Sequence, residues 1–279
     1  MNTPLPGRQQ GRMTICRDKM NWDKLAPAIQ NIVEEAGMLA FEGFREGRQT
    51  TSRIWYKDGG SPVTASDIAA NDLLEEKLQK LLPEAAWLSE ETTDHSDRLS
   101  KNLVWIVDPI DGTRAFLSGH PDWCVSVALL ADGQPVIGSI FAPALQIRYS
   151  AVQNNGAERN GRAMAVSTRP TLADARIAGP KPMIAAVERV AGPAHRLARI
   201  PSLALRLARV AEGSIDVGLV SGMARDWDIA AADLILREAG GIMTGLSGEA
   251  VRYNNPFPTH GELAASSKLL HSSLIETFA

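Results

Sequence analysis

The sequence predicts a mixed α/β fold in two lobes, and three observations support that prediction. Apolar residues recur at helical spacing over Asp23–Arg48, whereas Leu103–Val107 is a short, continuously apolar run of the kind that forms a buried strand. Two further apolar runs flank Asp132-Gly133, a pair typical of β-hairpins. Helices that alternate with strands, followed by a meander, favour a sheet with helices packed on it.

In the first half of the chain, each expected element has a local cause. The helix Asp23–Arg48 has one apolar face. Thr64-Ala-Ser-Asp67 has the form of a capping box, which predicts a helix that begins there and ends at Pro83. The remaining apolar runs are expected to be strands. These strands are Ala85–Leu88, Leu103–Val107, Val125–Ala131, Val136–Phe141 and Ile147–Val152.

In the second half of the chain, segments with helical spacing alternate with a short strand-like run. Leu203–Ala211 and Ile229–Ala239 have helical spacing, and the second is followed by Gly240-Gly241, a common helix end. Between them, Ser214–Leu219 is expected to be a strand. The stretch Pro170–Arg199 is rich in Ala, Pro and Gly and matches neither period.

The 279 residues, with 44% hydrophobic and 22% charged side chains, have the composition of a globular protein. We expect residues 1–20 to form a flexible polar tail. Residues 21–155 would form an N-terminal α+β lobe that carries most of the candidate site residues, and residues 156–279 a C-terminal α/β lobe that completes the site.

Charge and cysteine content exclude several classes of protein. The net charge of −3 gives no overall attraction to a nucleic acid polymer or an anionic membrane. No apolar run approaches the roughly 18 residues of a membrane span, and Met1–Lys19 lacks the apolar core of a signal peptide. We therefore expect a cytoplasmic protein. Cys16 and Cys124 lack the spacing of a zinc site and are interpreted as structural or incidental thiols.

The most informative segment is Asp108-Pro-Ile-Asp111-Gly112-Thr113, directly after an apolar strand. A turn here can direct both carboxylates and the Ile110 carbonyl towards one point, and Mg²⁺ prefers such all-oxygen ligands. Gly112 and Thr113 would then allow backbone N–H groups at a helix start to approach an anion. The structural alternative is a plain Asp-Pro turn with solvated carboxylates.

Three other segments place acids at the ends of elements. Glu90-Glu91 follows a strand, and its alternative interpretation is a solvated loop. Asp228 precedes a helix, where it would be a plain N-cap. Asp67 is the acidic partner of the capping box. Taken together, with no His or Cys beside them, these acids argue against zinc. They favour two Mg²⁺ ions about 3.5–4 Å apart that neutralise a phosphate, position a water and stabilise the leaving oxygen.

In this order, the motifs resemble those of one enzyme family. The segments are Ser89-Glu90-Glu91, Trp105-Ile-Val-Asp108-Pro-Ile-Asp111-Gly-Thr113 and Trp227-Asp228-Ile-Ala-Ala. They are similar to the motifs of the lithium-sensitive, magnesium-dependent phosphatases that include inositol monophosphatase and the 3′(2′),5′-bisphosphate nucleotidases. The resemblance covers about Lys57 to Gly241. It implies a dimeric αβαβα sandwich of the sugar-phosphatase type, with the site between two lobes.

The resemblance also implies a task for each acid. Glu90, Asp108 and the Ile110 carbonyl would hold the first magnesium, while Asp108, Asp111 and Asp228 would hold the second. Glu90 would help to place a third, weaker ion.

Other residues would act on the water and the phosphate. Asp67 and Thr113 would orient and activate the nucleophilic water, and Gly112 and Thr113 would donate to the phosphate, which also lies against Asp111 and Asp228. Lys57 matches a loop lysine near the third ion, in a loop that is one residue shorter here.

Within the family, Pro62–Asp67 and Ser89-Glu90-Glu91 are closer to the bacterial bisphosphate nucleotidases. Inositol phosphatases carry a glutamate seven residues before the last aspartate, and here that position is Ser221. Arg206 aligns with a nucleotidase lysine and would contact a second phosphate; its alternative is a solvated helix face. Near the site in sequence, we interpret Trp123 as a core residue and His120 as a loop residue.

The sequence therefore favours hydrolysis of 3′-phosphoadenosine 5′-phosphate to AMP and phosphate by a metal-activated water. The first alternative is a myo-inositol 1-phosphate, and sugar bisphosphates are a weaker one. A hypothesis of another class is an interaction protein, because some bacterial relatives bind the transcription machinery. Partner binding that survives Asp108→Asn while turnover vanishes would show such a role.

Overall fold

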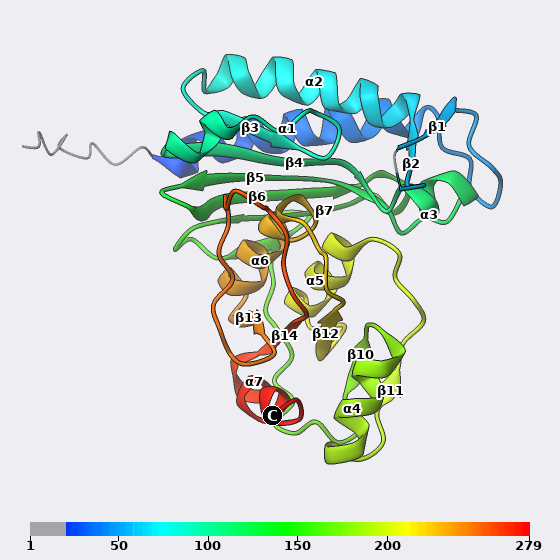
Figure 1. Cartoon of the computed structure of the whole chain (residues 1–279), viewed down its shortest axis with the longest axis vertical. Helices are drawn as coiled ribbons and strands as arrows, with labels where there is room; N and C mark the ends of the chain where they lie inside the picture. Colours follow the sequence, from blue (N-terminus) through cyan, green and yellow to red (C-terminus); the bar gives the residue numbers. More distant parts are fainter. Residues whose placement is uncertain (1–20, 58) are drawn as a thin grey trace, which may run out of the picture.

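Five layers of secondary structure are stacked in the order helices, sheet, helices, sheet, helices (Figure 1). The computed structural model describes residues 21–57 and 59–279, so the tail expected over residues 1–20, with Cys16, lies outside the described residues. The layer order confirms the αβαβα fold class. Among the described helices, none is long and apolar enough to cross a membrane.

The first sheet has seven strands, and helices α1 (Trp22–Phe41) and α2 (Ala65–Leu81) cover its outer face. Strands β3 and β4 are parallel, and the later strands form an antiparallel meander. Leu74 and Leu78 of α2 share an apolar core with Trp105 of β4. In chain order the strands are β3 (Ala86–Ser89), β4 (Leu103–Asp111), β5 (Cys124–Ala131), β6 (Gln134–Ala142), β7 (Ile147–Val152), β8 (Ala157–Arg159) and β9 (Arg162–Ala163).

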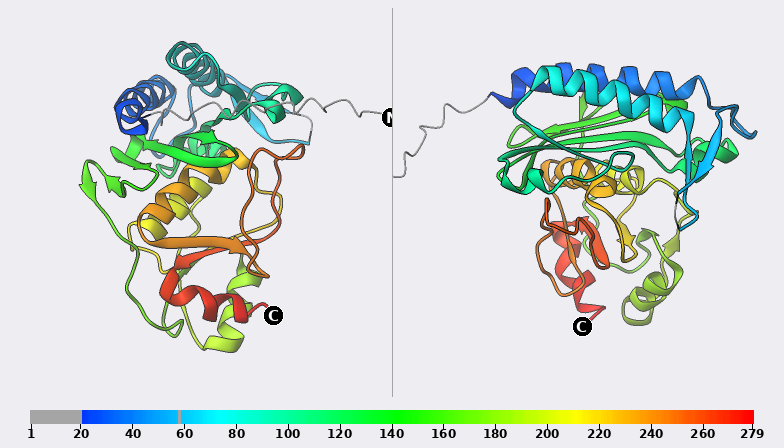
Figure 2. Two further views of the ribbon diagram at one scale, coloured as in Figure 1. Left: turned by 90° about the vertical axis from the view of Figure 1, so that its left-hand side faces the viewer. Right: turned by 45° about the horizontal axis from the view of Figure 1, so that its top comes forward.

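Helices α5 (Leu203–Ala211) and α6 (Asp226–Glu238) lie between the first sheet and a second, five-stranded sheet. Helices α4 (Lys181–Ala191) and α7 (Lys268–Glu276) pack on the far face of the second sheet (Figure 2). The second sheet contains β10 (Arg176–Ala178), β11 (His195–Arg196), β12 (Val217–Val220), β13 (Gly241–Gly245) and β14 (Leu263–Ser267).

Short elements connect these layers. Strands β1 (Ile54–Tyr56) and β2 (Pro62–Thr64) form an antiparallel pair that contacts the short helix α3 (Thr113–Ser118). The 3₁₀ turns are η1 (Ser96–Ser100) and η2 (Pro143–Leu145). The first sheet runs to Ala163 and the second begins at Arg176, so the chain passes from one sheet to the other between these residues.

Two elements that depend on neighbouring residues, a capping box and a hairpin turn, occur as predicted. The capping box at Thr64 is present, with the Asp67 carboxylate accepting from the Thr64 N–H and hydroxyl. The hairpin at Asp132-Gly133 is confirmed, and both residues have positive φ, 51° and 75°, as a primed turn requires.

Two helix boundaries were predicted wrongly. The first helix ends at Phe41 and not at Arg48, because the chain reverses there and the Gly43 carbonyl accepts from the Thr50 hydroxyl at 2.6 Å. Helix α6 begins at Asp226, three residues before the predicted Ile229. Asp228 therefore lies inside the first turn, and the interpretation of Asp228 as the N-cap is wrong. The unassigned Pro170–Arg199 stretch holds β10, α4 and β11.

Candidate metal centre

A β-bulge at the end of β4 positions Asp108 and Asp111. The sequence predicts that the strand ends at Val107, but β4 continues to Asp111. Asp108 pairs with Ser126 and Asp111 with Cys124, so three steps along β4 face two steps along β5. In a regular strand, residues three apart point to opposite faces. The extra residue brings both carboxylates to one face, a use of bulges that is frequent near active sites.

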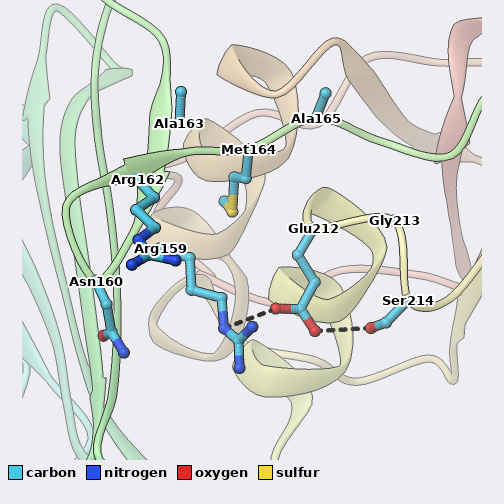
Figure 3. Close-up of a pocket in the computed structure, with 9 residues that line it drawn as sticks. All are labelled: Arg159, Asn160, Arg162, Ala163, Met164, Ala165, Glu212, Gly213 and Ser214. Atoms are coloured by element: carbon cyan, nitrogen blue, oxygen red, sulfur yellow. Dashed lines mark hydrogen bonds and ion pairs between the residues drawn. The ribbon is translucent and has the colours of Figure 1, made fainter.

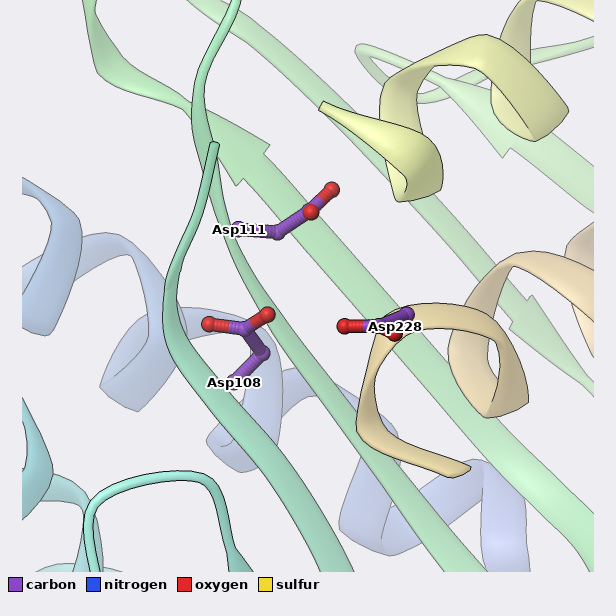
Figure 4. A group of neighbouring side chains, drawn as sticks. All are labelled: Asp108, Asp111 and Asp228. Atoms are coloured by element: carbon purple, nitrogen blue, oxygen red, sulfur yellow. The ribbon is translucent and has the colours of Figure 1, made fainter. Parts of the chain in front are cut away.

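The third carboxylate belongs to helix α6, which lies between the two sheets. Asp228 lies in the first turn of α6, where its Oδ2 accepts from the Arg225 N–H at 2.7 Å. Asp108, Asp111 and Asp228 each offer an oxygen, and these oxygens all lie within 4.8 Å of one another. In Figure 4 the Asp228 carboxylate faces Asp108, and Asp111 lies beside them. The fold therefore brings three of the predicted metal ligands together from segments about 120 residues apart.

Burial and mutual repulsion raise the pKa of all three carboxyl groups. Burial, with the charge of Glu90 added, raises the pKa of Asp108 well above its usual range. Burial and the charge of Asp111 raise the pKa of Asp228 to about 8. The pKa of Asp111 rises only to about 6, because hydrogen bonds oppose the effect of burial. Within the described part of the chain, no lysine or arginine forms a salt bridge with this trio.

Such a donor set fits a hard divalent cation. All three side chains offer carboxylate oxygen, and an ion of charge +2 would remove the repulsion that raises their pKa values. The carbonyl of Ile110, another predicted ligand, accepts from the Thr113 hydroxyl at 3.1 Å. The residues at this site therefore fit the metal that the sequence motifs imply.

Asp111 is held by a helix that the sequence did not connect with it. The Ser202 hydroxyl and the Ala204 N–H, at 2.7 Å, both donate to Asp111 Oδ2, and the Leu203 N–H donates to Oδ1 at 3.2 Å. These groups form the N-terminus of α5, which favours a negative charge. Ser202 has a recognisable signal as the N-cap of α5, but its partner is 91 residues away in sequence and could not be read from it.

Glu90 lies beside the trio but outside it. Its Oε1 accepts from Lys57 Nζ at 3.1 Å, and Lys57 also bonds to Glu91 Oε1 at 2.7 Å. Although burial lowers the pKa of Lys57, the charges of the two glutamates more than compensate and raise it. The two glutamates are thus paired, and the solvated-loop interpretation of Glu90-Glu91 is wrong.

Asp67 and Thr113 lie next to each other, and Asp67 is close enough to Glu90 and Glu91 to feel their charges. The distance from Thr113 Oγ1 to Asp67 Oδ1 is 3.5 Å, a long contact, because the same hydroxyl donates to Ile110. Burial raises the pKa of Asp67 to about 7. Asp67 therefore combines the capping role with a carboxylate oxygen available to a second partner. Gly112, at φ 94°, precedes α3, so a helix does start at Thr113 as expected.

Arg206 bonds to backbone carbonyl groups within the fold. Its guanidinium donates to the carbonyl oxygens of Leu219 and Ile200, each at 2.9 Å. The side chain therefore ties α5 to β12 and is not a solvated helix face. Its Nε has no hydrogen-bond partner among the described residues, and contact with a second phosphate stays a prediction. Ser221, in contrast, is exposed.

The remaining candidates are structural. Trp123 is fully buried and meets Phe116 edge-on at a centroid distance of 4.9 Å, so it is a core residue. His120 is an exposed loop residue whose Nδ1 accepts from the Asp122 N–H. Cys124 is a buried thiol, and burial raises its pKa well above the usual range.

A cavity of about 730 Å³ lies at the opposite end of α5 from Asp111 (Figure 3). Glu212 crosses it, paired with Arg159 at 3.1 Å and with the Ser214 hydroxyl at 2.8 Å. None of the predicted site residues lines it. This cavity is therefore separate from the carboxylate trio.

Comparison with known proteins agrees with the geometry. The model of the inositol monophosphatase family matches residues 18–279. The chain belongs to this family. It is 31% identical to an inositol-1-monophosphatase of Mesorhizobium japonicum, over 89% of this chain and 95% of that one. It is 32% identical to a 3′(2′),5′-bisphosphate nucleotidase, CysQ, of Aggregatibacter actinomycetemcomitans, over 81% and 87%.

A solved family structure shows the same fold. An IMPase of Thermotoga maritima superimposes with a TM-score of 0.78 at 28% identity, covering 91% of this chain and 96% of that one. As a family member, the chain is a phosphoric monoester hydrolase. The family consists of metal-dependent phosphatases that act on small phosphorylated substrates, and the acidic trio is compatible with binding a metal ion.

Proposed function

We propose that this chain is a Mg²⁺-dependent phosphatase that hydrolyses 3′-phosphoadenosine 5′-phosphate to AMP and phosphate. The observation that supports metal-dependent hydrolysis is the trio of Asp108, Asp111 and Asp228, whose oxygens lie within 4.8 Å of one another. Magnesium bound there, with Glu90 and the Ile110 carbonyl completing the ligands, would neutralise the phosphate and lower the pKa of a water.

The chain's own residues then orient the reactants. Asp67 would accept the proton of the attacking water at Oδ1, the carboxylate oxygen that faces the Thr113 hydroxyl. Thr113, which contacts both Asp67 and the Ile110 carbonyl, would keep the water in line with the phosphorus. The N–H groups of Gly112 and Thr113, at the start of α3, would hold the phosphate oxygens.

The choice of nucleotide over inositol rests on Ser221. A hydroxyl at this exposed position gives an inositol ring no carboxylate acceptor. The bonds of Arg206 to Leu219 and Ile200 add nothing to this choice, and its contact with a second phosphate stays a prediction. The second candidate, a myo-inositol 1-phosphate, is supported by the match over 89% of the chain to the inositol-1-monophosphatase.

Phosphate release measured side by side on the two substrates tests this choice. We expect kcat/KM for the adenosine bisphosphate to exceed that for inositol 1-phosphate by about a hundredfold, the scale that a few kcal/mol of differential binding provides. Ser221→Glu is the matched variant, and it should raise activity on inositol 1-phosphate. A ratio that favours inositol 1-phosphate in the unaltered protein would overturn the proposed substrate.

Other features stay predictions from the sequence. They are the homodimer, the cytoplasmic location, the third ion near Lys57, and the division into lobes at residues 155 and 156. Each would be needed for a full description of the enzyme, but the proposed hydrolysis requires only the trio and the residues around it.

A further inference from the structure

Arg98, in the loop that follows the Glu90-Glu91 segment, is an arginine with only 2% of its surface exposed. Its Nε and Nη2 donate to the two carboxylate oxygens of Asp94 at 2.6 and 2.9 Å. Its Nη1 and Nη2 donate to Asn254 Oδ1 at 2.7 Å and the Asn255 carbonyl at 3.0 Å. Burying a guanidinium is costly unless its donors are satisfied, and here the partners come from two segments about 160 residues apart in sequence.

Asn254 bonds both to Arg98 and to the first turn of α6. Its Nδ2 donates to the Arg98 carbonyl at 3.2 Å, so the two residues bond reciprocally. Asn254 adopts φ 58°, a left-handed conformation, and in it the backbone N–H donates to Asp226 Oδ2 at 2.8 Å. The contact with Arg98 therefore fixes a strained residue that is itself bonded to α6.

Asp226 is the first residue of α6 and is fully buried. Its other oxygen, Oδ1, lies 2.7 Å from His260 Nε2. The His260 N–H donates to the Ala224 carbonyl at 2.8 Å, directly before the helix. Both carboxylate oxygens of Asp226 are thus occupied by the loop that carries Asn254 and His260, and that loop holds the first turn of α6 from outside.

Asp226 lies in the same helical turn as a predicted metal ligand. Asp226 precedes the metal-site residue Asp228 by two residues, and Asp94 follows Glu90 by four. One end of the chain of bonds therefore lies at η1, which packs against β3 of the first sheet, and the other lies in the first turn of α6, which also holds Asp228. We call the set Asp94, Arg98, Asn254, Asp226 and His260 the interlobe clamp.

We propose that the interlobe clamp positions Asp228 against Asp108 and Asp111, so that Arg98 and Asp226 are positioning residues for divalent-cation binding. This inference rests on the proposed metal site and is independent of the organic substrate. Three carboxylates that repel one another would move apart if α6 were free to shift. The clamp opposes that movement by holding the first turn of α6. None of its members belongs to the trio, so it would act on the metal site through Asp228.

Calorimetric titration of Mg²⁺ into the full chain, without substrate, tests the proposal. Residues that orient metal ligands commonly contribute about 10–100-fold to affinity, so Asp226→Ala should weaken Mg²⁺ binding at least about tenfold. Arg98→Met cuts the clamp without altering α6 and should weaken binding in the same direction. Asp226→Asn retains an acceptor for Asn254 and a donor for His260, and should restore most of the affinity.

Asp216→Ala is the matched control. Asp216 is also buried and is paired with an arginine, Arg176, at 2.8 Å, but it lies at the start of β12 and outside the clamp. The Asp216→Ala substitution should lower the Tm and leave the Mg²⁺ affinity unchanged.

Unchanged affinity in folded Asp226→Ala and Arg98→Met would overturn the positioning role, as would equal weakening in Asp216→Ala. Loss of the fold in both clamp variants would make the clamp a folding element only. An unaltered protein that binds no Mg²⁺ would instead overturn the proposed function, and the inference with it.

Discussion

Asp228→Asn is expected to abolish turnover and to stabilise the metal-free protein. Asparagine keeps the acceptor for the Arg225 N–H, so the first turn of α6 stays intact. It removes one metal ligand, and it also removes a carboxyl group that must hold its proton in the folded metal-free protein at neutral pH, because its pKa is about 8. A bound metal contributes several kcal/mol to the transition state, and about 1.4 kcal/mol changes the rate tenfold. We expect phosphate release to fall about a thousandfold, and the Tm without metal to rise at neutral pH.

The two opposite effects distinguish a functional charge from a structural one. Sites that store repulsion for function commonly gain stability when that charge is removed. Asp233→Asn is the control on the same helix, since Asp233 is buried and accepts from the Tyr253 hydroxyl at 2.9 Å but lies outside the trio. It should retain turnover. Normal turnover in Asp228→Asn would contradict the assignment of Asp228 as a metal ligand.

The metal-free protein should lose stability as the pH rises from about 4 to about 8. The pKa of Asp228 is raised from 3.8 to about 8 and that of Asp67 from 3.8 to about 7. A raised pKa means that the folded state holds its proton more tightly than the unfolded chain. The stabilisation is complete below the unfolded value of 3.8 and is lost as the pH passes the folded values.

Thermal unfolding with and without Mg²⁺ measures this effect. Each kcal/mol shifts the Tm of a chain of this size by about 2–4 °C, so we expect a fall of about 10 °C between pH 5 and pH 8 without metal. Mg²⁺ should restore the Tm at pH 8 and have little effect at pH 5, where protons compete for the carboxylates. In Asp228→Asn both dependences should shrink. A Tm of the metal-free protein that rises over this range would contradict the pKa shifts.

Much of the fold was predictable because its signals are local. The capping box at Thr64 and the turn at Asp132-Gly133 each involve neighbouring residues and occur as expected. The end of the first helix at Phe41 was not predictable in this way. It depends on the return of the chain past Gly43, a contact between residues that no periodic pattern records.

The site was predictable as a set of acids but not as a geometry. Spacing indicated Asp108 and Asp111, yet their common face results from a bulge against β5. The helix N-terminus that holds Asp111 and the clamp that holds α6 join residues 91 to 156 positions apart. Arg206 was predictable as a cation near the site, but its bonds to the carbonyl oxygens of Leu219 and Ile200 could not be read from the sequence.

Crystals grown with Mn²⁺ in place of Mg²⁺ would test the central claim most directly, through an anomalous difference map. Mn²⁺ takes the same oxygen ligands as Mg²⁺. The geometry predicts a strong peak bounded by the carboxylates of Asp108, Asp111 and Asp228, whose oxygens already lie within 4.8 Å of one another. An empty trio in crystals of protein that is active with Mn²⁺, with peaks only at other acids, would contradict it.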